Sequence, residues 1–138
     1  MTDMELYRAA EAARAHSYSP YSAYAVGAAL LAESGKLYTG CNVENAAYGP
    51  SNCAERTAFF KAVSEGDRRF LAIAIAGGHA GEERLDFCPP CGVCRQVMQE
   101  FCEPERFRII LGRSDGVLKS FLLKELLPLG FGAALKGE

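Results

Sequence analysis

The sequence predicts an α/β protein in which helices cover a mixed β-sheet. Segments with apolar residues at helical spacing alternate with short apolar runs of strand length, which is the pattern of a layered α/β fold. The chain has 138 residues, of which 49% are hydrophobic and 23% are charged. This size and composition are typical of a single globular domain that buries its core without disulfides. We therefore expect one domain over residues 1–138.

The first helix is predicted by its start signal. Thr2 and Glu5 have the spacing of a capping box, and apolar residues then recur at helical intervals. A helix is expected from about Asp3 to Ala15, before the break at Pro20. Two strands should follow as a hairpin, the first over residues 26–32 and the second over residues 36–41, around a Glu-Ser-Gly-Lys turn.

The remaining elements alternate in type. Asn52 is a favourable N-cap for a second helix that Gly66 can end, and a buried strand over 70–76 should stop at the glycine pair 77–78. A third helix is expected to start near Cys91 and to close before Pro104. The last elements should be a strand over 107–111, a fifth strand over 117–122 and a short turn over 123–127.

Composition and charge restrict the function. A net charge of −2 argues against a protein that binds nucleic acid through phosphate contacts. No apolar run reaches membrane-spanning length, and the first ten residues lack the apolar core of a signal peptide. We therefore expect a cytoplasmic protein whose six cysteines are reduced. A Cys-x-x-Cys motif in such a protein indicates metal binding or catalysis.

Two short stretches carry the chemistry. Cys53-Ala54-Glu55 falls at the start of the second helix, and Cys91 with Cys94 falls at the start of the third. With Asn52 as the cap, Cys53 is the first helical residue and Glu55 the third. Free N–H groups and the helix dipole favour thiolates there. Three thiolates leave the fourth position of a tetrahedral zinc site open for water, and Glu55 can carry its proton.

The residues also allow a different site. Arg56 can donate hydrogen bonds to a thiolate and offset the negative charge of three sulfurs, although it is also an ordinary solvated helix residue. Cys88 forms a second Cys-x-x-Cys motif with Cys91, so that a closed four-cysteine structural site is possible. Glu55 would then be only the partner of a helix cap. The spacing favours the catalytic site and leaves the structural one open.

The chain resembles the small homotetrameric, zinc-dependent cytidine deaminases with three cysteine ligands. The resemblance rests on the Cys-Ala-Glu and Pro-Cys-x-x-Cys signature and covers nearly the whole chain. Further matching segments are Tyr18-Ser19-Pro20-Tyr21-Ser22, Val26-Gly27-Ala28-Ala29, Gly40-Cys41-Asn42-Val43-Glu44-Asn45-Ala46, Tyr48-Gly49, Cys91-Gly92-x-Cys94-Arg95-Gln96, and Leu126-Leu127-Pro128 with Phe131.

The resemblance implies a three-layer αβα sandwich around a five-stranded mixed sheet and a homotetramer with sites near subunit interfaces. It implies hydrolytic deamination of cytidine and 2′-deoxycytidine to uridine and 2′-deoxyuridine, with release of ammonia, as in pyrimidine salvage. One Zn²⁺ per subunit, held by Cys53, Cys91 and Cys94, would acidify the water that attacks C4. Glu55 would pass the proton from this water to N3 of the pyrimidine and then protonate the departing amine.

The same resemblance assigns substrate contacts. Asn42 and Glu44 are expected to hold the ribose 3′-hydroxyl. They can act together because residues i and i+2 of an extended segment point to the same side. The Ala54 N–H is expected to bind the pyrimidine O2. Tyr24 stands where the family usually has a phenylalanine against the base, which leaves the shape of the pocket open. The residues expected to reach a neighbouring subunit's site, with simple packing as the alternative, are Ala46, Tyr48 and Phe131.

Three other functions are compatible with parts of the pattern. A deaminase of a modified cytosine nucleoside, such as the blasticidin deaminases, would share the zinc signature, whereas a free ribose hydroxyl suits the Asn42 and Glu44 pair better. A nucleic-acid-editing deaminase is disfavoured because the chain has no basic insert. A structural zinc module would need the closed four-cysteine site.

Overall fold

The computed structural model describes residues 1–132 and confirms the predicted α/β fold. A five-stranded sheet has the order β2-β1-β3-β4-β5. No helix within these residues is long and apolar enough to cross a membrane. In chain order the elements are α1 (Asp3–Ala13), a 3₁₀ turn (Arg14–His16), β1 (Tyr24–Ala32), β2 (Leu37–Cys41), α2 (Ala54–Ser64), β3 (Phe70–His79), α3 (Gly92–Phe101), β4 (Arg108–Gly112), β5 (Leu118–Leu122) and α4 (Leu123–Leu126).

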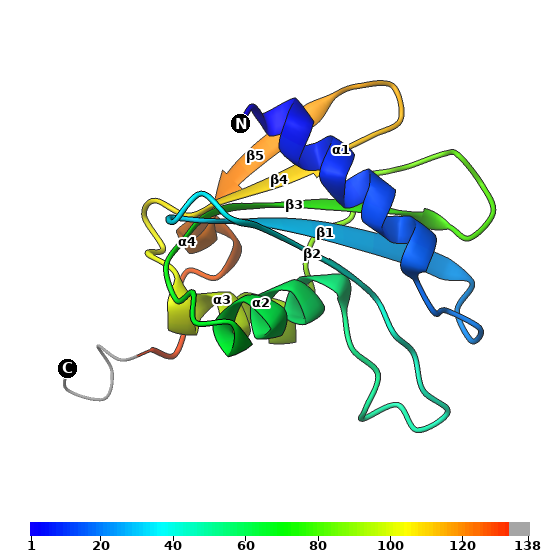
Figure 1. Ribbon diagram of the computed structural model, residues 1–138, viewed down its shortest axis with the longest axis horizontal. Helices are drawn as coiled ribbons and strands as arrows, with labels where there is room; N and C mark the ends of the chain where they lie inside the picture. Colours follow the sequence, from blue (N-terminus) through cyan, green and yellow to red (C-terminus); the bar gives the residue numbers. More distant parts are fainter. Residues whose placement is uncertain (133–138) are drawn as a thin grey trace.

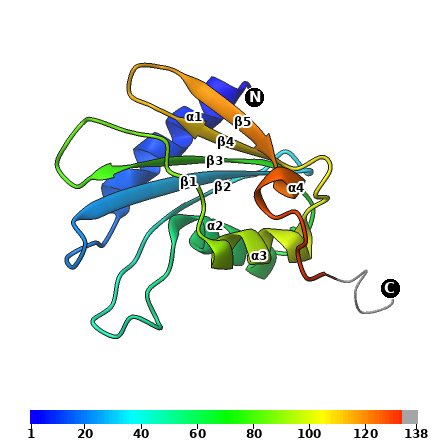
Figure 2. The same cartoon turned by 180° about the vertical axis from the view of Figure 1, so that it is seen from behind.

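The sheet is mixed. β1 runs antiparallel to both of its neighbours, β3 and β4 are parallel, and β5 is antiparallel to β4. It follows that β2, β3 and β4 share one direction. Helix α2 follows β2 and helix α3 follows β3, so both helices start from the end of the sheet at which these strands finish. Helix α1 covers one face, while α2 and α3 lie side by side on the other (Figures 1 and 2).

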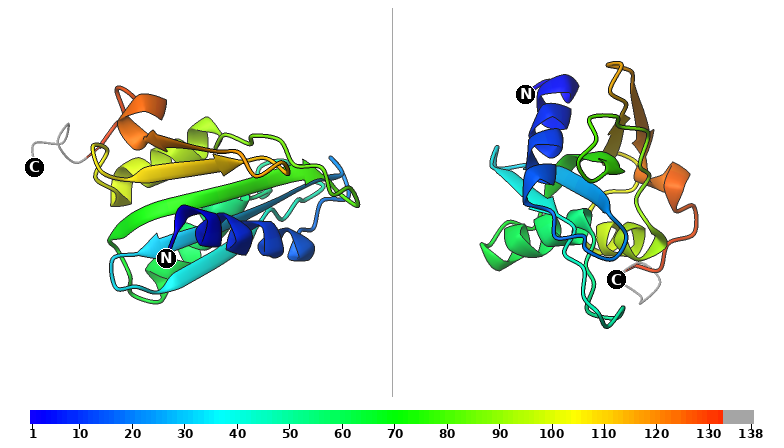
Figure 3. Two further views of the ribbon diagram at one scale, coloured as in Figure 1. Left: turned by 90° about the horizontal axis from the view of Figure 1, so that it is seen from above. Right: turned by 90° about the vertical axis from the view of Figure 1, so that its right-hand side faces the viewer.

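Alternation along the strands builds a core on each face. On β3, Ile73 and Ile75 face α2 and α3, whereas Ala72, Ala74 and Ala76 face α1. The successive side chains of a strand point to opposite faces, so one apolar run supplies both layers. Seen from above, α1 lies in front of the sheet (Figure 3, left). The three-layer arrangement that the family resemblance implies is therefore present.

Helix α1 begins as its sequence predicts. The Thr2 hydroxyl accepts a hydrogen bond from the Glu5 N–H at 3.1 Å, and the Thr2 N–H donates to the Glu5 carboxylate at 2.9 Å. The α-helix ends at Ala13, and the chain continues in the 3₁₀ turn. The Arg14 side chain then donates to backbone carbonyls of β1 and β3. These bonds hold the end of the first helix against the sheet.

The predicted cap of the second helix was wrong by one residue. Cys53, with an extended backbone, is the N-cap, and Glu55 is the second helical residue instead of the third. Asn52 exchanges two backbone hydrogen bonds with Val43, at 2.9 and 3.0 Å, which keeps it in extended pairing. Its side chain donates to Thr57 at 3.3 Å and caps no backbone N–H. The helix therefore starts one residue later than the sequence indicates.

Strand β3 runs through the glycine pair that was expected to stop it. Gly77 and Gly78 pair with Val26 and Ala25 of β1, and the strand ends at His79. A Cβ on Gly77 would lie 2.7 Å from the Cys88 sulfur, so the absence of a side chain is what lets Cys88 pack on the strand. Glycine here marks a close approach and not a strand end.

Two glycines allow the helices to approach the sheet closely. A Cβ on Gly27 of β1 would lie 2.0 Å from the Ala10 carbonyl oxygen of α1. A Cβ on Gly40 of β2 would lie 2.5 Å from the Ala54 carbonyl oxygen and 2.6 Å from the Ala58 nitrogen of α2. The neighbouring atoms are backbone, which cannot turn aside. Gly40 in particular sets the height of the first turn of α2 above the sheet.

We expect Gly27→Ala to lower the free energy of unfolding by about 2 kcal/mol or more, because the added methyl group forces α1 off the sheet. Urea unfolding followed by circular dichroism measures the change. Gly49→Ala is the matched control, since a Cβ on Gly49 meets nothing within 4 Å. Equal unfolding midpoints for the two variants would contradict the close packing of α1.

Candidate metal centre and active site

Three cysteines from two helix starts meet at one end of the sheet. Cys53 is the N-cap of α2 and Cys91 is the N-cap of α3, with Cys94 one turn further along. Their sulfur atoms all lie within 4.8 Å of one another, and they form the one group of potential metal ligands found among residues 1–132. Cys53 is half-buried, Cys91 exposed and Cys94 buried. The cluster thus opens toward solvent on one side.

The sulfur spacing fits a tetrahedral zinc ion. Cys53 and Cys91 sulfurs are 3.7 Å apart, and Cys91 and Cys94 sulfurs are 3.4 Å apart. With Zn–S distances of about 2.3 Å, ideal tetrahedral geometry places sulfurs roughly 3.8 Å from each other. Closely grouped thiols at two helix N-termini are also the donors that zinc prefers. The residues present therefore fit zinc with three protein ligands.

Hydrogen-bond donors favour the thiolate form of Cys53. The pKa of Cys53 is lowered to about 5, first by a hydrogen bond from the Cys94 thiol and then by the Arg56 guanidinium, against the opposing effect of burial. Arg56 donates from Nη2 to the Cys53 sulfur at 3.3 Å. The same sharing of a proton raises the pKa of Cys94. The Arg56 guanidinium thus lies against the sulfur cluster, where its positive charge can offset that of a thiolate.

Glu55 is a buried acid beside this cluster. Its side chain is 4% exposed, although it sits in the first turn of α2. Burial raises the pKa of Glu55 to about 7, and the negative charge of Cys53 adds to the rise. A carboxyl group with a pKa near neutrality can both accept and donate a proton at physiological pH. An ordinary cap partner would instead be solvated, with a pKa near 4.3.

Cys88 lies near the site without joining the cluster. It is not among the three sulfurs that lie within 4.8 Å of one another. Burial raises the pKa of Cys88 to about 11, and the charge of Glu55 contributes, while a hydrogen bond with the Tyr24 hydroxyl opposes the rise. A thiol of this kind is neutral at pH 7. The geometry therefore favours an open three-sulfur site over the closed four-cysteine alternative.

A cavity of about 370 Å³ lies in front of the two helix starts. Glu55, Cys53 and Cys91 line it together with Ala54 and Arg56. Its volume falls within the range of small-molecule sites. The loop over residues 42–52, which projects from the body of the protein, forms its other wall (Figure 1). Other lining residues are Val26, Asn42, Glu44, Tyr48, Ser51, Asn52, Cys88 and Pro89.

Asn42 and Glu44 line this cavity as a pair; Asn42 also binds the start of β1, and Glu44 binds the loop before it. The Asn42 amide oxygen accepts from the Val26 N–H at 3.0 Å, and its nitrogen donates to the Tyr24 carbonyl at 2.8 Å. The Glu44 carboxylate accepts from the Tyr21 and Ser22 N–H groups at 3.0 and 3.1 Å. Each side chain is thereby fixed in direction. An amide N–H of Asn42 and lone pairs on Glu44 remain for a ligand.

The other residues expected to contact substrate are more dispersed. Tyr24 is not among the lining residues; its ring packs edge-on against His79, with centroids 5.4 Å apart. Ala54 lines the cavity at the first position of α2, where its N–H has no helical partner. Ala46 is exposed in the projecting loop, and Tyr48, 87% exposed, stands at the cavity rim. Phe131, near the end of the described chain, is exposed and lies outside this cavity.

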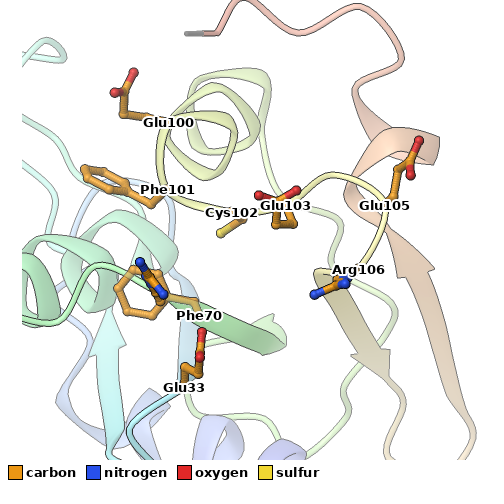
Figure 4. Close-up of a pocket in the computed structure, with 9 residues that line it drawn as sticks. Glu33, Phe70, Glu100, Phe101, Cys102, Glu103, Glu105 and Arg106 are labelled. Atoms are coloured by element: carbon orange, nitrogen blue, oxygen red, sulfur yellow. The ribbon is translucent and has the colours of Figure 1, made fainter. Parts of the chain in front are cut away.

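A larger cavity of about 940 Å³ lies elsewhere on the molecule. Glu100, Glu103 and Glu105 surround it, with Arg106 and Phe70 also on its wall (Figure 4). Cys102 is its sole thiol among the lining residues, and none of the three clustered cysteines belongs to it. It holds only one isolated thiol, whereas the smaller cavity contains Cys53 and Cys91 of the sulfur cluster together with Glu55, so we place the candidate active site at the smaller cavity.

Some site residues carry no recognisable signal in the sequence. Val26, Ser51 and Pro89 line the cavity but form no motif with the ligands. They become neighbours of the ligands only in the folded chain, where their segments lie close to the two helix starts. The spacing of Cys88 from Cys91 indicated a metal ligand, whereas in the structure Cys88 only lines the cavity.

Comparison with known proteins agrees with this geometry. The family described as the cytidine and deoxycytidylate deaminase zinc-binding region matches residues 1–110. The cytidine deaminase of Sporosarcina psychrophila is 49% identical over 119 residues, which is 86% of this chain and 83% of the relative. The cytidine deaminase of Halalkalibacterium halodurans is 48% identical over 93% of this chain and 92% of the relative.

Solved structures give the same result for the fold. A crystal structure of cytidine deaminase from Burkholderia pseudomallei superposes with a TM-score of 0.85 at 46% identity, covering 95% of this chain and all of the other. One from Mycobacterium tuberculosis gives a TM-score of 0.79 at 38% identity, covering 96% and 98%. The sulfur cluster, the buried carboxyl group and these similarities together show that the chain belongs to the zinc-binding cytidine and deoxycytidylate deaminase family.

Proposed function

We propose that this protein hydrolyses cytidine and 2′-deoxycytidine to uridine and 2′-deoxyuridine, with release of ammonia. The observation that carries the proposal is the position of Glu55. It is a buried carboxyl group with a pKa raised to about 7 that lines the same cavity as Cys53 and Cys91. Relatives that are 48–49% identical over most of the chain are named cytidine deaminases.

Cys53, Cys91 and Cys94 are proposed to hold one Zn²⁺. When bound, zinc supplies a water molecule that loses a proton near neutral pH. Glu55 accepts that proton and delivers it to N3 of the pyrimidine as the oxygen adds to C4. Glu55 then takes the second proton, from the hydroxyl group now on C4, and transfers it to N4, so that the C4–N4 bond breaks, C4 becomes a carbonyl and ammonia leaves. One carboxyl group serves as base and then as acid, which suits a pKa close to the working pH.

Ribose and base contacts follow from the remaining lining residues. The carboxylate of Glu44 and the free amide N–H of Asn42 are proposed to bind the ribose 3′-hydroxyl, since they can accept and donate respectively. The Ala54 N–H at the start of α2 is proposed to bind the pyrimidine O2. Tyr24 is proposed to reach the base only after its ring turns away from His79. Asn42, Glu44 and Ala54, by contrast, already line the cavity.

We further propose a single catalytic domain that acts in pyrimidine salvage in the cytoplasm as a homotetramer. The support is that aromatic side chains such as Tyr48 and Phe131 are 87% and 57% exposed, and exposed aromatic side chains are typical of surfaces that a partner covers. Ala46 lies in the same projecting loop as Tyr48. These three residues are proposed to reach the site of a neighbouring subunit.

Replacement of Cys94 by serine should abolish stoichiometric zinc binding, because the variant leaves two thiolates at the site. Zinc per chain is measured by atomic emission on protein purified with added zinc. Cys88→Ser is the matched control and should keep the metal content of the unmodified protein. Loss of zinc from Cys88→Ser would show that a fourth sulfur completes a closed structural site.

Glu55→Gln should retain zinc and lower kcat for cytidine by at least about 100-fold, because glutamine can neither accept nor donate the proton. The fall in absorbance as cytidine becomes uridine measures turnover, and zinc is quantified in the same sample. Glu100→Gln, on the exposed side of α3, should keep full activity. Near-normal turnover by Glu55→Gln would sink the proposed mechanism, while turnover of a modified cytosine nucleoside alone would change the substrate.

A further inference from the structure

Arg95 links the stretch that carries the metal ligands to the C-terminal part of the fold. It lies on α3, one residue after Cys94, and its guanidinium forms two hydrogen bonds to backbone carbonyls. Nε donates to the Pro90 oxygen at 2.8 Å, and Nη1 donates to the Leu126 oxygen at 2.7 Å. Pro90 directly precedes Cys91, and Leu126 is the last residue of α4. One side chain thus joins two segments 36 positions apart in the sequence.

Both carbonyls depend on this side chain. The Pro90 residue is fully buried, and a buried carbonyl oxygen needs a donor. The Leu126 oxygen lies at a helix end, where intrahelical donors run out. Arg95 makes no ion pair with a carboxylate among the described residues, so its charge is directed to these two oxygens. Guanidinium suits this because it presents several donors in a fixed plane.

The ligand nearest to this link is the least enclosed of the three. Cys91 is exposed, whereas Cys53 is half-buried and Cys94 is buried. The residues before Cys91 are two prolines, which have no N–H with which to anchor the loop. On the other side of this loop, the Cys91 carbonyl accepts a hydrogen bond from the backbone N–H of Arg95 at 3.0 Å. Arg95 therefore binds the carbonyl oxygens of both Pro90 and Cys91, before and after the ligand's Cα atom.

The other end of the link is a firmly packed element. Leu123 of α4 is fully buried, and Leu126 and Leu127 pack against the core that contains Cys94 and Met98. The neighbouring side chain Gln96 donates to the Phe131 carbonyl at 2.6 Å, which lays the following segment along α3. Figure 2 shows α4 and this segment beside α3. The C-terminal part of the fold can thus serve as a fixed support for the ligand loop.

We propose that Arg95 is a positioning residue for the metal centre: by joining the Pro90 carbonyl to the end of α4, it fixes Cys91 and thereby slows the loss of zinc. The inference rests on the zinc site proposed above. Groups that orient a metal ligand from outside the coordination sphere typically change metal affinity by about 10- to 100-fold. The role does not require Arg95 to touch substrate.

The test measures zinc release in Arg95→Met, which keeps the apolar stem and removes both donors. Zinc-loaded protein is mixed with excess metallochromic chelator at neutral pH, and the release rate and competition affinity are recorded. We expect release about tenfold faster or more. Arg106→Met is the matched control, because the exposed Arg106 side chain forms no hydrogen bond or ion pair with described residues. It should release zinc at the rate of the unmodified protein.

Two further measurements separate positioning from simple stabilisation. The unfolding temperatures of zinc-free and zinc-loaded Arg95→Met are compared, and the loss should be larger for the zinc-loaded form. Equal losses with unchanged zinc release would assign Arg95 a purely structural role and overturn the proposal. If Arg95→Met does not fold, Arg95→Lys decides alone, because the one nitrogen of lysine cannot occupy both the Nε and the Nη1 positions from which arginine donates. Release at the control rate would then overturn the proposal. Absence of zinc from the unmodified protein would instead refute the proposed metal site itself.

Discussion

The site depends on the convergence of two helix starts at one end of the sheet. Because β2, β3 and β4 share a direction, α2 and α3 both begin where those strands finish. Gly40 then allows the first turn of α2 to lie almost on the sheet, since a Cβ there would meet backbone atoms at 2.5 and 2.6 Å. Without that approach, Cys53 would stand away from the two sulfurs of α3. Backbone topology and one missing methyl group thus bring together ligands that lie 38 residues apart in sequence.

This arrangement has a cost that the fold must offset. Glu55 is 4% exposed, and burial shifts its pKa upward to about 7, so that ionising it costs more in this cavity than in water. The sulfur cluster beside it adds negative charge. Arg56 on the next position supplies a compensating cation to Cys53. The same burial that weakens the carboxyl group as an acid makes it suitable for taking up and returning a proton within one turnover.

The sequence predicted the parts of this site that local patterns encode. The order of helices and strands along the chain follows from spacing and capping. Spacing favoured Cys53, Cys91 and Cys94 as ligands but left Cys88 open as a fourth, and the structure groups the first three sulfurs. The position of Asn52 was wrong because its backbone pairs with Val43, a contact that no local pattern reports. The prediction that the glycine pair ends β3 was wrong for a related reason: Gly77 leaves room for Cys88, which arrives from a separate loop. Long-range contacts, and not propensities, decide such positions.

Metal binding links these features to stability. The ligands come from two helices, so the unfolded chain does not hold them together, and an ion at the site would bind the native state in preference. At a free zinc concentration 1,000 times the dissociation constant, such binding stabilises the fold by about 4 kcal/mol. That amount is comparable with the penalty expected for a buried acid next to thiolates, which is of the order of several kcal/mol. A zinc ion held by the three sulfurs would therefore also offset the repulsion between negative groups in the cavity, and the hydrogen bonds of Arg95 would extend this stabilisation to the C-terminal elements that support Cys91.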